Sequence, residues 1–275
     1  MHHFNGRGVR ALPLLHPDGT PNLAPGLQVA LAASVGLDVT HEDVLAYIAG
    51  VVSHPAFTAT FEDELTTPGV RVPITKDPAL WQRAVELGRE VVWLHTYGES
   101  FVDKAAGREQ GNVRADWPTA VQPFSLEGVK EMPIKHFYDE VQHAIYFTAE
   151  DGSRNGVWGP VEKAVFDYTV GGMNVIGSWF KYRKKNPGGK KTSPLDDIHV
   201  TDWPHEWSLE FTELLTVLTR LVSLEPQQAA LLEEVLAGEL STMAELADAD
   251  VKWPQSRDDR KPRRKPVEGD AASLF

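Results

Sequence analysis

The sequence has 275 residues, of which 42% are hydrophobic, so we expect one or two domains with a substantial buried core. It contains no cysteine, which excludes disulfide bonds and thiolate metal sites. It also has neither an uncharged apolar run of about 18 residues nor an apolar signal-peptide core, so we expect a soluble, cytoplasmic protein with no membrane partner.

The net charge of −12 argues at first against nucleic-acid binding, but the charge is unevenly distributed. Residues 200–250 hold 11 acidic residues and one basic residue, a balance of −10. Residues 1–199 hold 24 acidic and 19 basic residues (−5), and residues 251–275 hold 4 acidic and 7 basic residues (+3). Most of the acidity therefore belongs to one late segment, and the rest of the chain can still form a local basic surface.

Two helices are predicted near the N-terminus. Asn22 is expected to cap a helix that runs to about Gly36. Thr40 followed by Asp43 resembles a capping box, and it predicts the start of a second helix that ends near Pro55.

The middle of the chain changes from helical to β-type periodicity. Residues 56–65 are predicted to be helical, and residues 78–95 form the clearest helix because apolar residues recur there at steps of four and three. Residues 98–131 are rich in glycine, proline and charge and are predicted to be a loop. Aromatic and β-branched residues then predict a hairpin or small sheet at 133–158.

The last part of the chain is predicted to be helical again. Pro160 is expected to begin a helix that ends at Gly171, and a shorter helix follows from Val175 to Tyr182. After Trp203 a strong helix is expected, with Pro226 starting its antiparallel partner. The fold class is thus α+β: a helical N-terminal part, a small central β-sheet, a helical C-terminal hairpin and a disordered basic tail from residue 249 onwards.

Catalytic motifs are missing from the sequence. It contains no phosphate-binding loop, no dinucleotide-binding glycine motif, no His-Glu-x-x-His and no nucleophile elbow. The segment Asn186–Gly189 does not match the tetrapeptide with which amino-methyltransferases hold their target amino group. Ten histidines lack metal-ligand spacing. We therefore expect no catalytic residue and no metal site.

The best positive feature is a basic turn, residues 178–191, with a charge of +6 and no acid. Lysine and arginine neutralise DNA phosphates whatever the base sequence. The cationic residues of this turn are Lys181, Arg183, Lys184, Lys185, Lys190 and Lys191.

A second group of candidates has side chains that can read base edges, since arginine pairs with guanine and asparagine with adenine. Those near the N-terminus are Asn5, Arg7 and Arg10. Those in the predicted loops of the middle region are Arg108, Asn112, Arg114, Arg154 and Asn155.

Four stretches in order along residues 4–225 resemble the C-terminal region of Type ISP restriction–modification enzymes. They are Phe4–Arg7 with Pro21–Leu23; Glu42–Ile48 with Ser53–Phe57; Arg71–Ile74 with Leu87–His95; and Tyr168–Gly172 with Trp179, Tyr182 and residues 208–222. Enzymes of that family join a nuclease, a helicase, an adenine methyltransferase and a C-terminal target-recognition domain in one chain.

The resemblance implies a DNA target-recognition module of a restriction–modification or phage-defence adenine methyltransferase, inactive on its own. Residues 1–200 would form the recognition domain, 201–248 a helical hairpin packed on it, and 249–275 a flexible tail. The methyltransferase, helicase and nuclease parts are absent from this sequence. The resemblance therefore implies a separately encoded methyltransferase or helicase chain as partner, with S-adenosylmethionine bound by the methyltransferase. The sequence is equally compatible with a piece of a longer polypeptide.

Two alternatives involve no direct DNA contact. The acidic segment at 208–240 suits an interaction or scaffold subunit that docks a basic partner or imitates nucleic-acid charge. The terminal Ser273–Phe275 faintly resembles the end of a sliding-clamp-binding peptide, although the upstream glutamine is missing.

Overall fold

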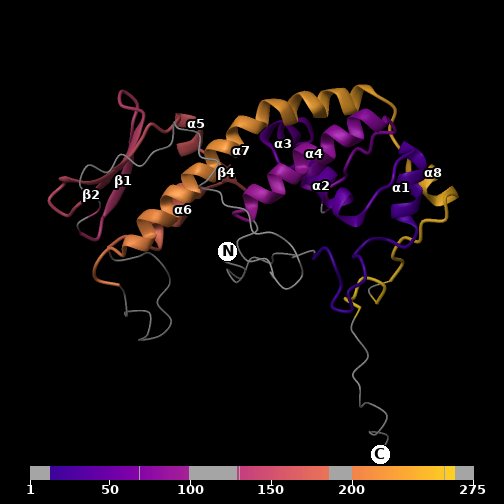
Figure 1. The fold of residues 1–275 in the computed structure, drawn as a ribbon, viewed down its shortest axis with the longest axis horizontal. Helices are drawn as coiled ribbons and strands as arrows, with labels where there is room; N and C mark the ends of the chain where they lie inside the picture. The colour runs from indigo at the N-terminus through magenta and orange to yellow at the C-terminus, as the bar shows by residue number, and fades with distance from the viewer. Residues whose placement is uncertain are drawn as a thin grey trace, which may run out of the picture. The chain divides into compact units, whose positions relative to one another are not determined.

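The computed structural model of the chain describes residues 13–67, 69–98, 129, 131–185, 200–256 and 258–263. They divide into two units (Figure 1). The helical unit comprises Met1–Val91 and Gln227–Phe275, and the sheet unit comprises Val92–Pro226. The helices α4 and α7 each contribute residues to both units.

The helical unit is built from short helices around the longer α4. Its elements are α1 (Leu27–Val35), α2 (His41–Val52), α3 (Pro55–Thr60), the 3-10 helix η1 (Glu64–Thr66), α4 (Pro78–His95), the end of α7 (His205–Ala237) and α8 (Met243–Asp248). The predicted capping box is confirmed, because the Thr40 side chain accepts from the Asp43 amide while the Asp43 carboxylate accepts from the Thr40 amide. The predicted cap at Asn22 is wrong: Gly26 occupies the N-cap of α1, and the Asn22 side chain donates to the Pro13 carbonyl instead.

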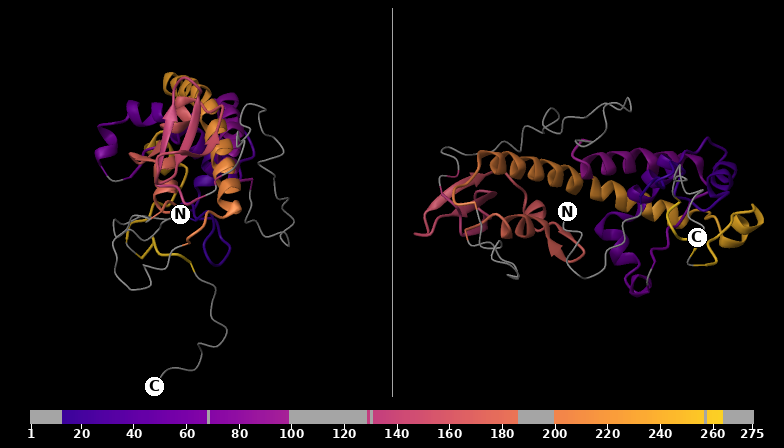
Figure 2. Two further views of the ribbon diagram at one scale, coloured as in Figure 1. Left: turned by 90° about the vertical axis from the view of Figure 1, so that its left-hand side faces the viewer. Right: turned by 90° about the horizontal axis from the view of Figure 1, so that it is seen from below.

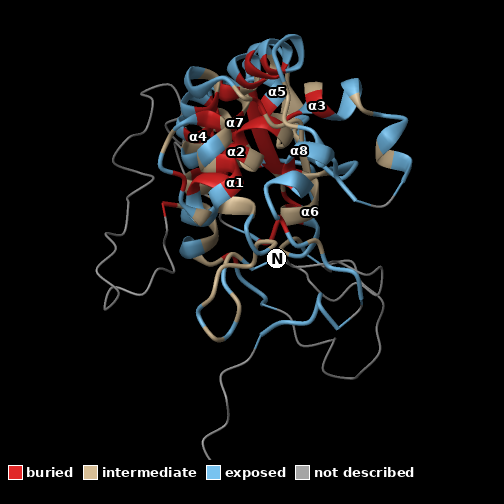
Figure 3. Cartoon of the chain, turned by 90° about the vertical axis from the view of Figure 1, so that its right-hand side faces the viewer, coloured by how far each residue is buried: buried red, intermediate tan, exposed pale blue. Residues whose placement is uncertain are grey.

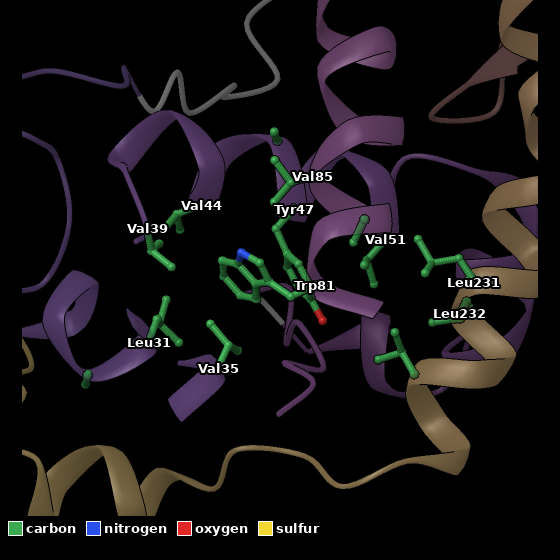
Figure 4. Close-up of a cluster of buried hydrophobic side chains, with 14 of the residues drawn as sticks. Leu31, Val35, Val39, Val44, Tyr47, Val51, Trp81, Val85, Leu231 and Leu232 are labelled. Carbon is green, nitrogen blue, oxygen red and sulfur yellow. The ribbon is translucent and has the colours of Figure 1, made fainter. Parts of the chain in front are cut away.

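The core of the helical unit gathers around a stacked aromatic pair. The rings of Tyr47 and Trp81 lie 4.4 Å apart between centroids and 17° from parallel. Figure 4 shows Val51 from α2 and Leu231 and Leu232 from α7 beside this pair. In Figure 3 the buried residues concentrate along α1, α2 and α4, with exposed residues outside them. This burial of apolar area is the main source of stability for the unit.

The sheet unit contains the predicted small sheet. Its elements are β1 (Lys135–Asp139), β2 (Ala144–Thr148), β3 (Arg154–Trp158), α5 (Lys163–Phe166), β4 (Thr169–Val170), β5 (Met173–Asn174), α6 (Val175–Lys181) and the first part of α7. The first three strands form one antiparallel sheet in the order β1-β2-β3, and β4 and β5 form a separate hairpin. The predicted α+β class is thus confirmed.

One face of the three-stranded sheet packs against α6 and α7 through aromatic side chains. Phe147 of β2 is fully buried, and its ring centroid lies 4.6 Å from Trp158, 4.8 Å from Phe180 and 5.2 Å from Phe211. The indole nitrogen of Trp158 donates to the Thr212 hydroxyl at 3.1 Å. Figure 2 shows the strands beside the first part of α7. On the opposite face Phe137 and Arg154 are exposed, whereas Tyr146 between them is buried.

The structure corrects two predicted helix boundaries. The turn expected before Pro226 is wrong, because α7 runs unbroken from His205 to Ala237 with Pro226 inside it. The helix expected to begin at Pro160 is shorter than predicted. It covers only Lys163–Phe166, since the Val161 amide donates to the carbonyl of His143 instead of entering a helix.

The segment after residue 249, predicted to be disordered, is held to the helical unit where the structure describes it. Val251 is buried in the core, Trp253 packs against it, and the Lys252 amide donates to the Pro25 carbonyl at 2.9 Å. Among the described residues, no helix is both long and apolar enough to cross a membrane.

Candidate nucleic-acid interface

Six of the predicted DNA-contacting residues are described, and all of them belong to the sheet unit. They are Arg154, Asn155, Lys181, Arg183, Lys184 and Lys185. The others lie outside the described residues: Asn5, Arg7, Arg10, Arg108, Asn112, Arg114, Lys190 and Lys191. The terminal Ser273–Phe275 also lies outside them.

Arg183 is held by aromatic rings and a carboxylate. Its guanidinium carbon lies 4.4 Å from the ring centroid of Trp179 and 5.7 Å from that of Trp207. One guanidinium nitrogen is 3.0 Å from the Glu210 carboxylate, and another donates to the Trp179 carbonyl at 3.3 Å. The charge of Arg183 is therefore largely compensated, and the side chain ties the end of α6 to α7.

The three lysines of the basic turn differ in their surroundings. Lys185 forms an ion pair with Glu150, and its amide donates to the Pro133 carbonyl at 2.7 Å. Within the described ranges, Lys181 and Lys184 make no ion pair with a carboxylate. Lys181 is exposed, with its amino group 5.8 Å from the ring of Tyr182, and Lys184 is half-buried. Among the four described cations of the turn, these two lysines have the least compensated charge and are the best candidates to meet phosphates.

A histidine lies beneath this turn. Burial lowers the pKa of His136, and the nearby charge of Lys184 lowers it further. Its ring packs 4.6 Å from Phe180 and 5.9 Å from Phe166, measured between centroids. At neutral pH His136 is thus uncharged and acts as part of the apolar packing below Lys184.

Arg154 projects from β3 on the outward face of the sheet. Its guanidinium carbon lies 3.9 Å from the ring centroid of Tyr146, and one of its nitrogens is 3.6 Å from the Asp139 carboxylate. The side chain is still 53% exposed. A cation held this way remains available to a ligand while its plane is fixed.

Asn155, the neighbour of Arg154, is buried with a relative exposure of 5%. Its side-chain amide donates to the Glu131 carbonyl at 2.7 Å, and its side-chain oxygen accepts from the Glu131 amide at 3.3 Å. The carboxamide therefore fastens the segment before β1 to β3. This placement does not favour the predicted role of Asn155 as a reader of bases.

Sequence reasoning missed the partners that surround Arg154. Phe137, Asp139 and Tyr146 lie within residues 133–158, for which only a hairpin or small sheet was predicted. The alternation along residues 135–139 is the signal that could have placed Phe137 and Asp139 on one face. No sequence signal pointed to Glu210 or Glu150 as partners of the basic turn. No group of three or more histidine, aspartate or glutamate side chains that could hold a metal ion occurs in the part of the chain that the structure describes.

Comparison with known proteins places this chain in a family. No curated protein matches it. A solved structure with similarity is that of a nuclease-deletion mutant of the Type ISP restriction–modification enzyme LlaGI in complex with a DNA substrate mimic, at 20% identity and a TM-score of 0.43. That similarity covers 75% of this chain and 17% of LlaGI, so the chain spans a small part of that enzyme. Residues 1–214 match the Type ISP C-terminal specificity domain, and the chain belongs to that family.

Proposed function

We propose that this chain is a DNA target-recognition module that binds duplex DNA and directs an adenine methyltransferase of a Type ISP-like restriction–modification or phage-defence system. The observation that carries the proposal is the match to the Type ISP specificity domain over residues 1–214. The exposed basic end of α6 and the outward-facing Arg154 supply the two kinds of contact that such a module needs, phosphate and base.

The catalytic step belongs to the methyltransferase in this proposal. That protein would flip an adenine out of the duplex and transfer a methyl group to it from S-adenosylmethionine. The present chain would supply the register on the DNA and bind no cofactor of its own. The methyltransferase and helicase would be supplied by a separate chain or by further parts of the same polypeptide.

Within the basic turn, Lys181 and Lys184 would contact phosphates, while Arg183 and Lys185 keep the turn in place. Each lysine that neutralises a phosphate releases counterions, so binding weakens as the salt concentration rises. The salt dependence therefore reports how many such contacts exist. For Lys181 and Lys184 together, removal should reduce the slope of log K against log salt by roughly 0.9 per lost contact.

The experiment is a binding titration of the full chain on a randomised duplex library at several salt concentrations, followed by sequencing of the bound DNA. The wild-type chain should enrich one sequence. The double variant Lys181→Glu/Lys184→Glu should bind all sequences more weakly with a flatter salt dependence. Lys252→Glu is the matched control, since Lys252 lies on the helical unit in an ion pair with Asp250. Failure of the wild-type chain to enrich any sequence contradicts the proposal.

An acidic interaction subunit is the second candidate, favoured by the balance of −10 over residues 200–250. Several of these acids already bind cations of the helical unit: Glu234 pairs with Arg83, and Glu239 and Glu245 pair with Lys76. Such a protein would show no DNA affinity that falls steeply with salt. The same titration therefore separates the two candidates.

A further inference from the structure

Strand β3 contains a bulge that decides which way Arg154 points. Tyr146 pairs with Val157 and Thr148 pairs with Arg154, so two steps along β2 match three steps along β3. In a regular strand, residues 154 and 157 would face opposite sides of the sheet. The extra residue places Arg154 on the same face as Tyr146, which is how a bulge redirects a side chain.

Two residues hold the bulge in place. The buried carboxamide of Asn155 is bonded at both ends to the backbone of Glu131. Gly156 has a φ of +105°, and a methyl group added there would lie 2.6 Å from a side-chain carbon of Val129. No other residue fits that position without strain. The bulge is therefore fixed independently of Arg154.

The guanidinium of Arg154 is fixed in its turn by two side chains. It stacks on Tyr146, whose hydroxyl donates to Gln142 and whose ring stacks on Phe137 at 5.2 Å and 18°. It also faces one oxygen of Asp139, whose other oxygen accepts from the amides of Val141 and Gln142 at 3.0 Å each. Both supports are thus themselves immobilised by the β1–β2 turn.

We propose that Arg154 is a specificity-determining residue that reads a guanine in the major groove of the target DNA, an inference that rests on the proposed function. The guanidinium fork matches the O6 and N7 acceptors of guanine, and this match depends on the plane of the fork. The fork can also bind a phosphate, so the test below distinguishes a contact to one base pair from a contact to the backbone. Tyr146 and Asp139 are positioning residues: they hold the guanidinium before DNA arrives, so little side-chain entropy is lost on binding.

The test compares the sequence preference of the wild-type chain with that of Arg154→Gln and Arg154→Lys, using the randomised duplex library. At one position the wild-type site should require a G·C pair. Arg154→Gln should lower the preference for G·C at that position by about 5- to 150-fold and leave the other positions unchanged. Arg154→Lys keeps the charge but not the fork, so it should lose most of the same discrimination while retaining more of the overall affinity.

Two further variants complete the design. Asp139→Asn should weaken discrimination at the same position without changing the salt slope, because it frees the guanidinium but removes no DNA contact. Lys135→Gln is the matched control. Lys135 lies on the same face of β1 as Asp139, and removing its charge should leave the sequence preference intact.

The outcomes separate this inference from the proposed function. A wild-type chain that selects no sequence overturns both. If the wild type selects a site and Arg154→Gln selects the same site with unchanged preference at every position, only the assignment of Arg154 is overturned. A loss of affinity that is equal for all sequences would make Arg154 a phosphate contact and also overturn the assignment.

Discussion

Gly50 of α2 and Gly88 of α4 lie at a backbone-to-backbone crossing where neither position has room for a side chain. A methyl group on Gly88 would overlap the carbonyl oxygen of Ala46 and lie 2.8 Å from the Gly50 amide nitrogen. A methyl group on Gly50 would overlap the carbonyl oxygen of Ala84. The reciprocal absence of side chains sets the distance between the two helices.

Replacing Gly88 with alanine should therefore lower the free energy of unfolding by about 1–3 kcal/mol. Moving the helices apart costs more than the roughly 1 kcal/mol that alanine's better helix propensity contributes. The measurement is the urea midpoint. Gly238→Ala is the control, because a methyl group there meets the nearest atom at an ordinary 3.5 Å. A Gly88→Ala protein as stable as the wild type would show that the crossing adjusts freely.

Removing the Tyr47 hydroxyl should destabilise the helical unit by about 1–3 kcal/mol. This hydroxyl donates to the Pro73 carbonyl at 2.9 Å and accepts from the amide of the fully buried Thr75 at 3.0 Å. In Tyr47→Phe both backbone groups lose their partner while the stack on Trp81 is kept. Burial also raises the pKa of Tyr47 to about 12, so ultraviolet titration of the folded wild type should show one tyrosine ionising late that the variant lacks. An unchanged unfolding curve would contradict this account.

Gln228 should be needed to complete the end of α2. It is 1% exposed, and its side-chain nitrogen donates to the Gly50 carbonyl at 3.1 Å and to the Ser53 hydroxyl at 3.3 Å. Gln228→Leu keeps the volume but removes the donor that both acceptors share, so we expect a loss of about 1–3 kcal/mol in thermal or urea unfolding. Its exposed neighbour offers the comparison, since Gln227→Leu should change stability little.

The link between Lys76 and Glu245 should make stability depend on acid pH. The Lys76 amino group and the Thr242 amide and hydroxyl lower the pKa of Glu245 from 4.5 to about 2. Because the folded pKa is depressed, the stabilisation is complete above pH 4.5 and is lost as the pH falls through about 2. Glu245→Gln keeps the capping geometry but not the charge. Glu245→Gln should be less stable than the wild type at pH 5, and this difference should shrink towards pH 2 and with added salt, because the wild type then loses its ion pair. A difference that stays constant with pH would argue against the ion pair.

The sequence predicted those elements whose signals are local. The helix at 78–95 was found with its correct bounds because a single apolar stripe runs along it, and the capping box at Thr40 was found because both partners lie within one turn. Pro226 misled because a proline inside a helix costs a hydrogen bond and a clash with the preceding turn, which predicts a break. The helix α7 nevertheless continues through Pro226, with buried leucines on either side of it at 224 and 231.

The candidate interface was harder to predict, because its geometry depends on contacts between distant residues. Arg183 meets Glu210, which lies 27 positions away, and Asn155 meets Glu131 from 24 positions away. The stack of Arg154 on Tyr146 depends on the one-residue bulge in β3. Without the bulge, strict alternation from Val157 would place Arg154 on the other face of the sheet. Residue type marks Arg154 as a candidate, and the contacts of Arg154 in the fold show why its direction is fixed.

Asn155 precedes Gly156, a pairing that loses ammonia readily in a flexible chain. There the unhindered glycine nitrogen attacks the carboxamide carbon, and the cyclic imide that forms hydrolyses to aspartate or isoaspartate. In the folded protein the Glu131 backbone holds both ends of the carboxamide and restrains it from meeting that nitrogen. Each unfolding event therefore exposes Asn155 to deamidation. The carboxylate that results cannot donate a hydrogen bond to the Glu131 carbonyl, as the Asn155 amide does. Protein that has been held unfolded long enough to deamidate at Asn155 should accordingly refold less well than freshly prepared protein.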